Sequence, residues 1–310
     1  MNNFNYEEKG KAIEELLKDI FYIKGTSNRS KISSIRIYSE IIIKKLLNIS
    51  IDEYLTLGDK ENKDKLIKLT NNDDFLINTI ESLRKKGNDA SHSQNLKMFN
   101  EDEYEEVLLH LLKLQSYLFV NYFKKYKFGK FSRILEVFSI LPPKLRNIVL
   151  DKLYYIDNKN ISVCDKLSLT ILKNEGKDKS LKWIERNKNN LISLECVTDQ
   201  FRQETLKVFG EKYLEIILND VPENMYICCI DKINHVSNIL ENKGIPYKTY
   251  EEAKGLYLRE GFIDEINDEI KEFNSIMKFI YLGRNEENNG KLNNINNYII
   301  IETLNNKGKK

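Results

Sequence analysis

Apolar residues recur at steps of three and four along most of this chain, and this spacing limits its fold more than any other feature. Leu16 and Ile20 show the spacing in one segment, and Tyr38 and Ile42 show it in the next. Residues at these steps lie on one face of an α-helix. The pattern therefore predicts a helical bundle over residues 1–126.

The same spacing continues between residues 127 and 220, where we expect helical hairpins. Pro142 and Pro143 fit the first turn of one helix, and Gly176 provides a connector between two others. No repeat of fixed length is present, so the hairpins indicate a solenoid only weakly.

After Pro222, short β-branched or aromatic runs interrupt the helical patterns. The candidate strands are residues 226–230, 279–281 and 298–302. The predicted fold class is therefore mainly α, in three parts: a helical bundle at 1–126, a helical hairpin region at 127–220, and a small α+β element with a polar loop and a basic tail at 221–310.

The balance of charge excludes a protein that coats nucleic acid through a global basic field. The chain has 49 basic and 47 acidic residues, a formal net charge of +2. Any contact with nucleic acid must come from a local patch. Lys124, Lys125 and Lys127 alternate with aromatic residues, a pattern that favours contact with phosphates and bases. The same pattern also fits the ordinary solvated end of a helix.

The sequence indicates a cytoplasmic protein without a metal or a cofactor. It has no Gly-rich phosphate loop, and no apolar segment is long enough to cross a membrane. The four cysteines lack the regular spacing of a zinc site, and we expect them to be buried, reduced thiols. They are Cys164, Cys196, Cys228 and Cys229.

Residues 84–92 carry most of the chain's chemistry, because they hold one of only three histidines. On a continuous helix, Arg84, Asn88 and His92 follow one another at steps of four and form a stripe able to face a phosphate. Gly87 with Asn88 is also a plausible helix stop, so two local structures remain open. Lys85 and Lys86 are further candidates for RNA binding.

Two further pairs of polar residues have the spacing of local helix contacts. Asn100 and Glu103 have the spacing of a capping box and predict the start of a helix that reaches Tyr126. Arg36 and Glu40 are four residues apart and predict an ion pair within one helix.

The segment from Arg84 to His92, preceded by Arg36 and Glu40 and followed by a capped helix, resembles an uncharacterised HEPN-like domain family of bacterial defence and restriction-associated proteins. The shared motif is Arg, two residues, Gly-Asn, and His a few residues later. The resemblance covers residues 1–126. It implies a helical bundle, often a homodimer, that works in prokaryotic defence or stress response.

Catalytic HEPN proteins are metal-independent endoribonucleases, and the resemblance gives each motif residue a role. His92 would act as acid or base at the ribose 2'-hydroxyl, Arg84 would stabilise charge on the phosphate, and Asn88 would orient the substrate. Seven residues separate Arg84 from His92, more than in the nuclease members. Lys86 is closer to His92, but a lysine offers no planar fork.

Three functions stay open at the level of sequence. The first is an antiviral, toxin-like endoribonuclease that uses His92 and Arg84. The second is a non-catalytic HEPN-like module that binds RNA, a nucleotide or a partner protein of a defence system. The third is a structural interaction protein in which Asn88 and His92 only hold the turn between two helices, and Arg84 pairs with Glu40 or another carboxylate.

Overall fold

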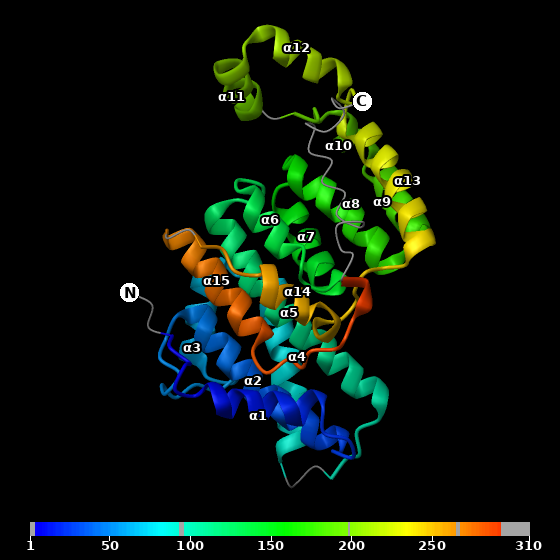
Figure 1. The fold of residues 1–310 in the computed structure, drawn as a ribbon. Coiled ribbons are helices and arrows are strands. Elements are labelled where there is room, and N and C mark those ends of the chain that lie inside the picture. Colours follow the sequence, from blue (N-terminus) through cyan, green and yellow to red (C-terminus); the bar gives the residue numbers. More distant parts are fainter. Residues whose placement is uncertain (1–3, 93–95, 198, 265–266, 293–310) are drawn as a thin grey trace. The chain divides into compact units, whose positions relative to one another are not determined.

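The computed structural model describes residues 4–292 except 93–95, 198 and 265–266. These residues form helices and no strand (Figure 1). The chain divides into two compact units. Unit 1 contains residues 1–126 and 261–286, and unit 2 contains residues 127–260 and 287–310. None of the described helices is long and apolar enough to cross a membrane.

Unit 1 is a bundle in which α2, α4 and α5 pack against one another. In addition, α1 packs on α2, and α15 packs on α5. Its helices are α1 (Gly10–Phe21), α2 (Asn28–Leu47), α3 (Lys60–Thr70), α4 (Asp74–Ser91), α5 (Glu101–Tyr126) and α15 (Asp268–Tyr281). The helical bundle predicted from the apolar spacing is confirmed, and residues 268–281 add a helix to it.

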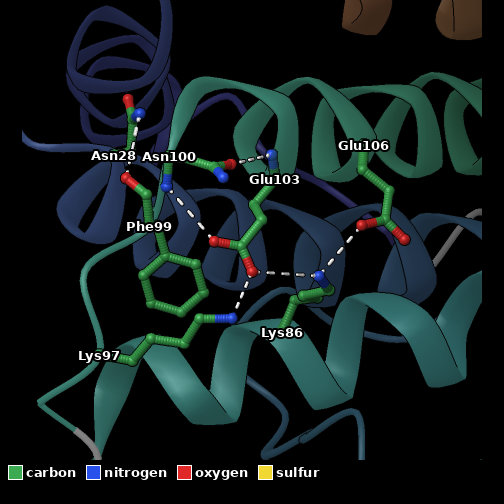
Figure 2. Close-up of polar contacts among 7 residues, drawn as sticks. All are labelled: Asn28, Lys86, Lys97, Phe99, Asn100, Glu103 and Glu106. Atoms are coloured by element: carbon green, nitrogen blue, oxygen red, sulfur yellow. Dashed lines mark hydrogen bonds and ion pairs between the residues drawn. The ribbon is translucent and has the colours of Figure 1, made fainter.

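Local capping signals set where these helices begin. The side chains of Asp59 and Asp73 accept hydrogen bonds from the first turns of α3 and α4. At the start of α5, the Asn100 side chain accepts a bond from the Glu103 N–H at 2.9 Å, and Glu103 accepts one from the Asn100 N–H at 3.3 Å (Figure 2). This reciprocal pair satisfies two backbone donors, and it confirms the predicted capping box.

Unit 2 is a second set of packed helices, in which α7, α8, α9 and α13 make the main contacts. Pro143 occupies the first turn of α7, as its fixed φ favours. Its helices are α6 (Ser132–Phe138), α7 (Pro143–Ile156), α8 (Ile161–Glu175), α9 (Lys177–Arg186), α10 (Lys188–Ile192), α11 (Asp199–Phe209), α12 (Glu211–Asp220), α13 (Met225–Lys243) and α14 (Tyr250–Glu260).

The predicted α+β element is wrong. Residues 226–230 lie in α13 and residues 279–281 lie in α15, while residues 298–302 are outside the described part of the chain. The periodicity of a short apolar run does not separate a buried helix segment from a strand, and each of the two described runs is part of a longer helix. In α13, the Asn224 side chain caps the first turn, and Cys229 and Ile233 are buried four residues apart. That is helical spacing.

Candidate functional site

The site predicted from the sequence lies on α4, which runs without a break from Asp74 to Ser91. Gly87 lies inside this helix, so the helix stop proposed for Gly87-Asn88 is wrong. Arg84 and Asn88 follow each other at a step of four on the helix, and His92 is the residue just after its end. The helix ends at His92, which has an extended backbone, and its N–H donates to the Asn88 carbonyl at 3.0 Å.

The close contact of α4 with α2 explains why position 87 is a glycine. A Cβ atom at this position would lie 2.8 Å from both Cβ and Cδ of Arg36. The absence of a side chain therefore allows α2 and α4 to approach closely. Arg36 forms the expected pair with Glu40, with Nε and Oε1 3.6 Å apart. Burial raises the pKa of Glu40, against the lowering effects of Arg36 and of the hydrogen bond from the Leu57 N–H.

The guanidinium of Arg84 is held by Glu81 on the preceding turn of α4. Its Nε donates to Oε2 at 3.0 Å and its Nη2 donates to Oε1 at 2.6 Å. These hydrogen bonds lower the pKa of Glu81 and raise that of Arg84. The sequence predicted a carboxylate partner for Arg84 and named only Glu40, although the spacing of three residues on one helix was a signal for Glu81.

Lys86 points in another direction, toward α5. Its Nζ lies 3.0 Å from Glu106 Oε2 and 3.7 Å from Glu103 Oε1, and Lys97 contacts the same Glu103 oxygen at 2.5 Å (Figure 2). The hydrogen bond to Glu106 is the main cause that raises the pKa of Lys86. Lys86 therefore joins two helices of the bundle, whereas its neighbour Lys85 is exposed.

His92 is exposed at the end of α4. Its backbone carbonyl accepts a bond from Arg29 Nη2 at 2.8 Å, and the hydroxyl groups of Ser33 and Ser91 are 3.1 Å apart beside it. Among the described residues, nothing forms a hydrogen bond or an ion pair with the side chains of Asn88 or His92. The His92 side chain is exposed, and that of Asn88 is partly exposed.

The length of α4 separates Arg84 from His92. Eight residues at 1.5 Å each place their Cα atoms about 12 Å apart along the helix axis. The Arg84 guanidinium extends toward Glu81, away from His92. As they lie in the structure, these two side chains point to different places along α4 and do not meet at one phosphate, whereas the stripe can contact successive phosphates or bases of an extended strand.

The lysines at 124, 125 and 127 provide fewer free charges than the sequence indicates. Lys125 Nζ lies 2.8 Å from Glu272 Oε2, and the Tyr126 hydroxyl donates to the same oxygen at 3.0 Å. Lys124 and Lys127 are exposed, and nothing in the described part of the chain pairs with them. Two of the three lysines thus remain available to an anion.

A small pocket lies beside the Arg84–Glu81 pair in unit 1. Its volume is about 30 Å³, and Thr56, Asp59, Asn62 and Glu81 are among the residues that line it. In the described part of the chain, no group of three or more His, Cys, Asp or Glu side chains is arranged to hold a metal ion.

Comparison of the chain with protein-family models, with curated proteins and with solved structures finds no match.

Proposed function

We propose that unit 1 is a HEPN-like module of prokaryotic defence that binds RNA along the Arg84–Asn88–His92 stripe and does not cleave it. One observation carries this proposal: α4 is continuous through Gly87 and holds Arg84 about two turns from His92. An endoribonuclease needs its proton-transfer group and its charge-stabilising group at the same phosphate. A binding surface has no such requirement.

The stripe retains the donors that RNA binding needs. A guanidinium has five N–H donors, and Glu81 accepts from two groups of Arg84, so further N–H groups remain for a phosphate oxygen. The Arg84 side chain is 35% exposed. Asn88 offers both an amide donor and an acceptor, and the His92 ring can stack on a base. Lys85 adds an exposed charge at the same end of the helix.

The second candidate is a metal-independent endoribonuclease formed by a homodimer. The exposure of His92 at the end of α4 favours this candidate, because a two-fold axis near that end would bring His92 of one copy near Arg84 of the other. Light scattering after size-exclusion chromatography tests the dimer. The endoribonuclease fails if the protein is a monomer at concentrations at which it binds RNA.

Binding is tested by fluorescence polarisation with a labelled single-stranded RNA of mixed sequence. We expect Arg84→Ala and His92→Ala to weaken binding. Glu81→Gln is the matched control, because it removes the negative charge that holds Arg84 and leaves only one acceptor oxygen in its place, and we expect it to tighten binding. The RNA should remain intact with all proteins when the samples are resolved on a denaturing gel.

A different result would contradict each of the proposed functions. Equal RNA affinity in wild type, Arg84→Ala and Glu81→Gln would overturn the binding proposal. RNA cleavage by wild type that is absent in His92→Ala would establish the dimeric endoribonuclease instead. A lower melting temperature of both Asn88→Ala and His92→Ala, without an effect on RNA, would indicate that these residues only support the bundle.

A further inference from the structure

Two of the four cysteines lie together at the edge of the core of unit 2. Cys196 follows α10, and Cys228 lies in the first turns of α13. Both side chains pack against the same buried cluster, and each thiol is the largest influence on the pKa of the other. A backbone bond of 2.9 Å from the Met225 N–H to the Leu194 carbonyl holds the two segments together.

We propose that Cys196 and Cys228 form a reactive dithiol, which hydrogen peroxide oxidises to a disulfide bond. Cys228 is the attacking residue and Cys196 is the resolving residue. The proposal depends on the pairing of the two thiols, on their accessibility and on the positive groups near Cys228.

Accessibility distinguishes this pair from the other two cysteines. Cys196 and Cys228 are partly exposed, whereas Cys164 and Cys229 are fully buried. Burial raises the pKa of Cys164 to about 12, and it is also the main cause that raises the pKa of Cys229. Buried, protonated thiols of this kind react slowly, because the thiolate is the nucleophile.

The surroundings of Cys228 favour its thiolate. The hydrogen bond from Cys196 and the ammonium of Lys232, one turn later on α13, lower the pKa of Cys228 against the effects of burial and of Asp165 and Asp231. Donation of its own proton to Cys228 raises the pKa of Cys196. The position of Cys228 near the start of α13 adds the positive end of the helix dipole.

Lys232 is held in place for this role. Its Nζ lies 2.5 Å from Asp165 Oδ1 on α8, and the two side chains are only 22% and 17% exposed. Although burial acts to lower it, the pKa of Lys232 is raised, chiefly by Asp165, so the ammonium keeps its charge. A fixed cation beside an accessible thiol, with a second thiol in contact, is the arrangement of peroxide-sensitive cysteines.

The oxidation has two steps. The Cys228 thiolate attacks one oxygen of hydrogen peroxide, the O–O bond breaks, and the leaving hydroxide takes a proton to become water. The product is a sulfenic acid at Cys228. The Cys196 sulfur then attacks the sulfenic sulfur, the S–O bond breaks, and the leaving hydroxide takes the Cys196 proton to become a second water. Two thiols lose two electrons in total, and the peroxide is reduced to water.

The disulfide bond would connect the two ends of the segment that contains α11 and α12. These helices pack against each other (Figure 1). The segment exposes Val208, Phe209 and Ile216. The two cysteines are 32 residues apart (228 minus 196). Oxidation would therefore add a covalent link at the base of this helical pair.

The test uses the full-length protein, reduced, freed of reductant and then treated with hydrogen peroxide. We expect free thiols to fall from four to two per chain. After the remaining thiols are blocked with N-ethylmaleimide, trypsin should release residues 189–202 and 213–232 as one linked species, which separates when dithiothreitol is added. Wild type is sufficient for this measurement, so it does not depend on the folding of any variant.

Three variants identify which cysteines form the disulfide bond. Cys229→Ala should still give the linked peptides, which assigns the bond to Cys228 within residues 213–232. Cys196→Ser should give no linked peptides and should leave a sulfenic acid on Cys228 that dimedone captures. Cys164→Ala is the matched control and should behave as wild type, with circular dichroism showing that each variant is folded.

The proposal is overturned if folded wild type forms no linked peptides under peroxide treatment that oxidises free cysteine in solution. It is also overturned if all four thiols are lost at the same rate, or if dimedone labels Cys229 rather than Cys228 in Cys196→Ser.

Discussion

Gly87→Ala tests the account of how α2 and α4 pack. The substitution adds one methyl group at the interface of the two helices. Its carbon would lie 2.8 Å from Cβ and Cδ of Arg36 and 2.9 Å from Cγ. Carbon atoms in contact prefer a separation of about 3.5–4.0 Å. The Cβ atom of Arg36 is fixed to the backbone of α2, so rotation of the side chain cannot remove the clash, and the helices must move apart.

Two opposing terms set the size of the effect. Alanine inside a helix is more favourable than glycine by about 1 kcal/mol. Overpacking of an interface costs about 1–3 kcal/mol, and the contact with a backbone-linked atom places this case near the upper value. We therefore expect Gly87→Ala to lower the free energy of unfolding by about 2 kcal/mol.

The free energy of unfolding is measured by urea denaturation followed by circular dichroism. Gly10→Ala is the matched control, because Gly10 is the first residue of α1 and a Cβ there would meet nothing within 4 Å. We expect the control to be as stable as wild type or slightly more stable. The account of the packing is refuted if Gly87→Ala is as stable as wild type or more stable. That is the result expected for a helical glycine that faces solvent and contacts no other helix.

Three further measurements test other parts of the structure. Asn100→Ala removes the cap of α5 and should lower the free energy of unfolding by about 1 kcal/mol in urea denaturation, whereas no loss would show that the capping box is dispensable. Burial lowers the pKa of Lys45 to about 8, beneath the value of 10.5 that it has when unfolded. Between pH 8 and pH 10.5 the unfolded chain therefore holds more protons than the folded protein, so the free energy of unfolding rises with pH. Between pH 7 and pH 9, wild type should gain about 1 kcal/mol of stability relative to Lys45→Met. Equal slopes for the two proteins would contradict this. Asp165→Asn leaves the partly buried Lys232 without its carboxylate and should cost about 3 kcal/mol, measured by the fluorescence of Trp183, which packs against the same core. The exposed pair of Arg133 and Glu136 in the same unit is the control, since Glu136→Gln should change little.

The helices of the chain could be predicted where local signals agree. Asn100 and Glu103 have the right spacing, an apolar face follows them, and the capping box is present in the structure. The run of residues 226–230 failed because its β-branched and aromatic side chains favour a strand, while its burial pattern is helical. The cap from Asn224 and the packing of Cys229 and Ile233 on the core outweigh that local preference.

The candidate site could be predicted only as a set of residues. The contact that explains Gly87 joins it to Arg36, which is 51 residues earlier in the chain (87 minus 36). Nothing in residues 84–92 separates a helix stop from a glycine that allows two helices to approach. The pairing of Arg84 with Glu81 differs in this respect, because both residues lie on one helix and their spacing alone indicates the contact.

Helix geometry also divides the basic residues of the motif between two roles. Residues two positions apart on a helix point about 200° apart, so Lys86 faces α5 while Arg84 points to the other side of α4. The ion pairs of Lys86 with Glu103 and Glu106 agree with this division. Lys86→Ala should therefore reduce thermal stability slightly and leave RNA affinity unchanged. Arg84→Ala should weaken RNA binding and leave thermal stability unchanged. Thermal unfolding and fluorescence polarisation on both variants measure the two effects. If Lys86→Ala weakens RNA binding as much as Arg84→Ala, the RNA surface extends across α4 to α5, and the stripe alone does not define it.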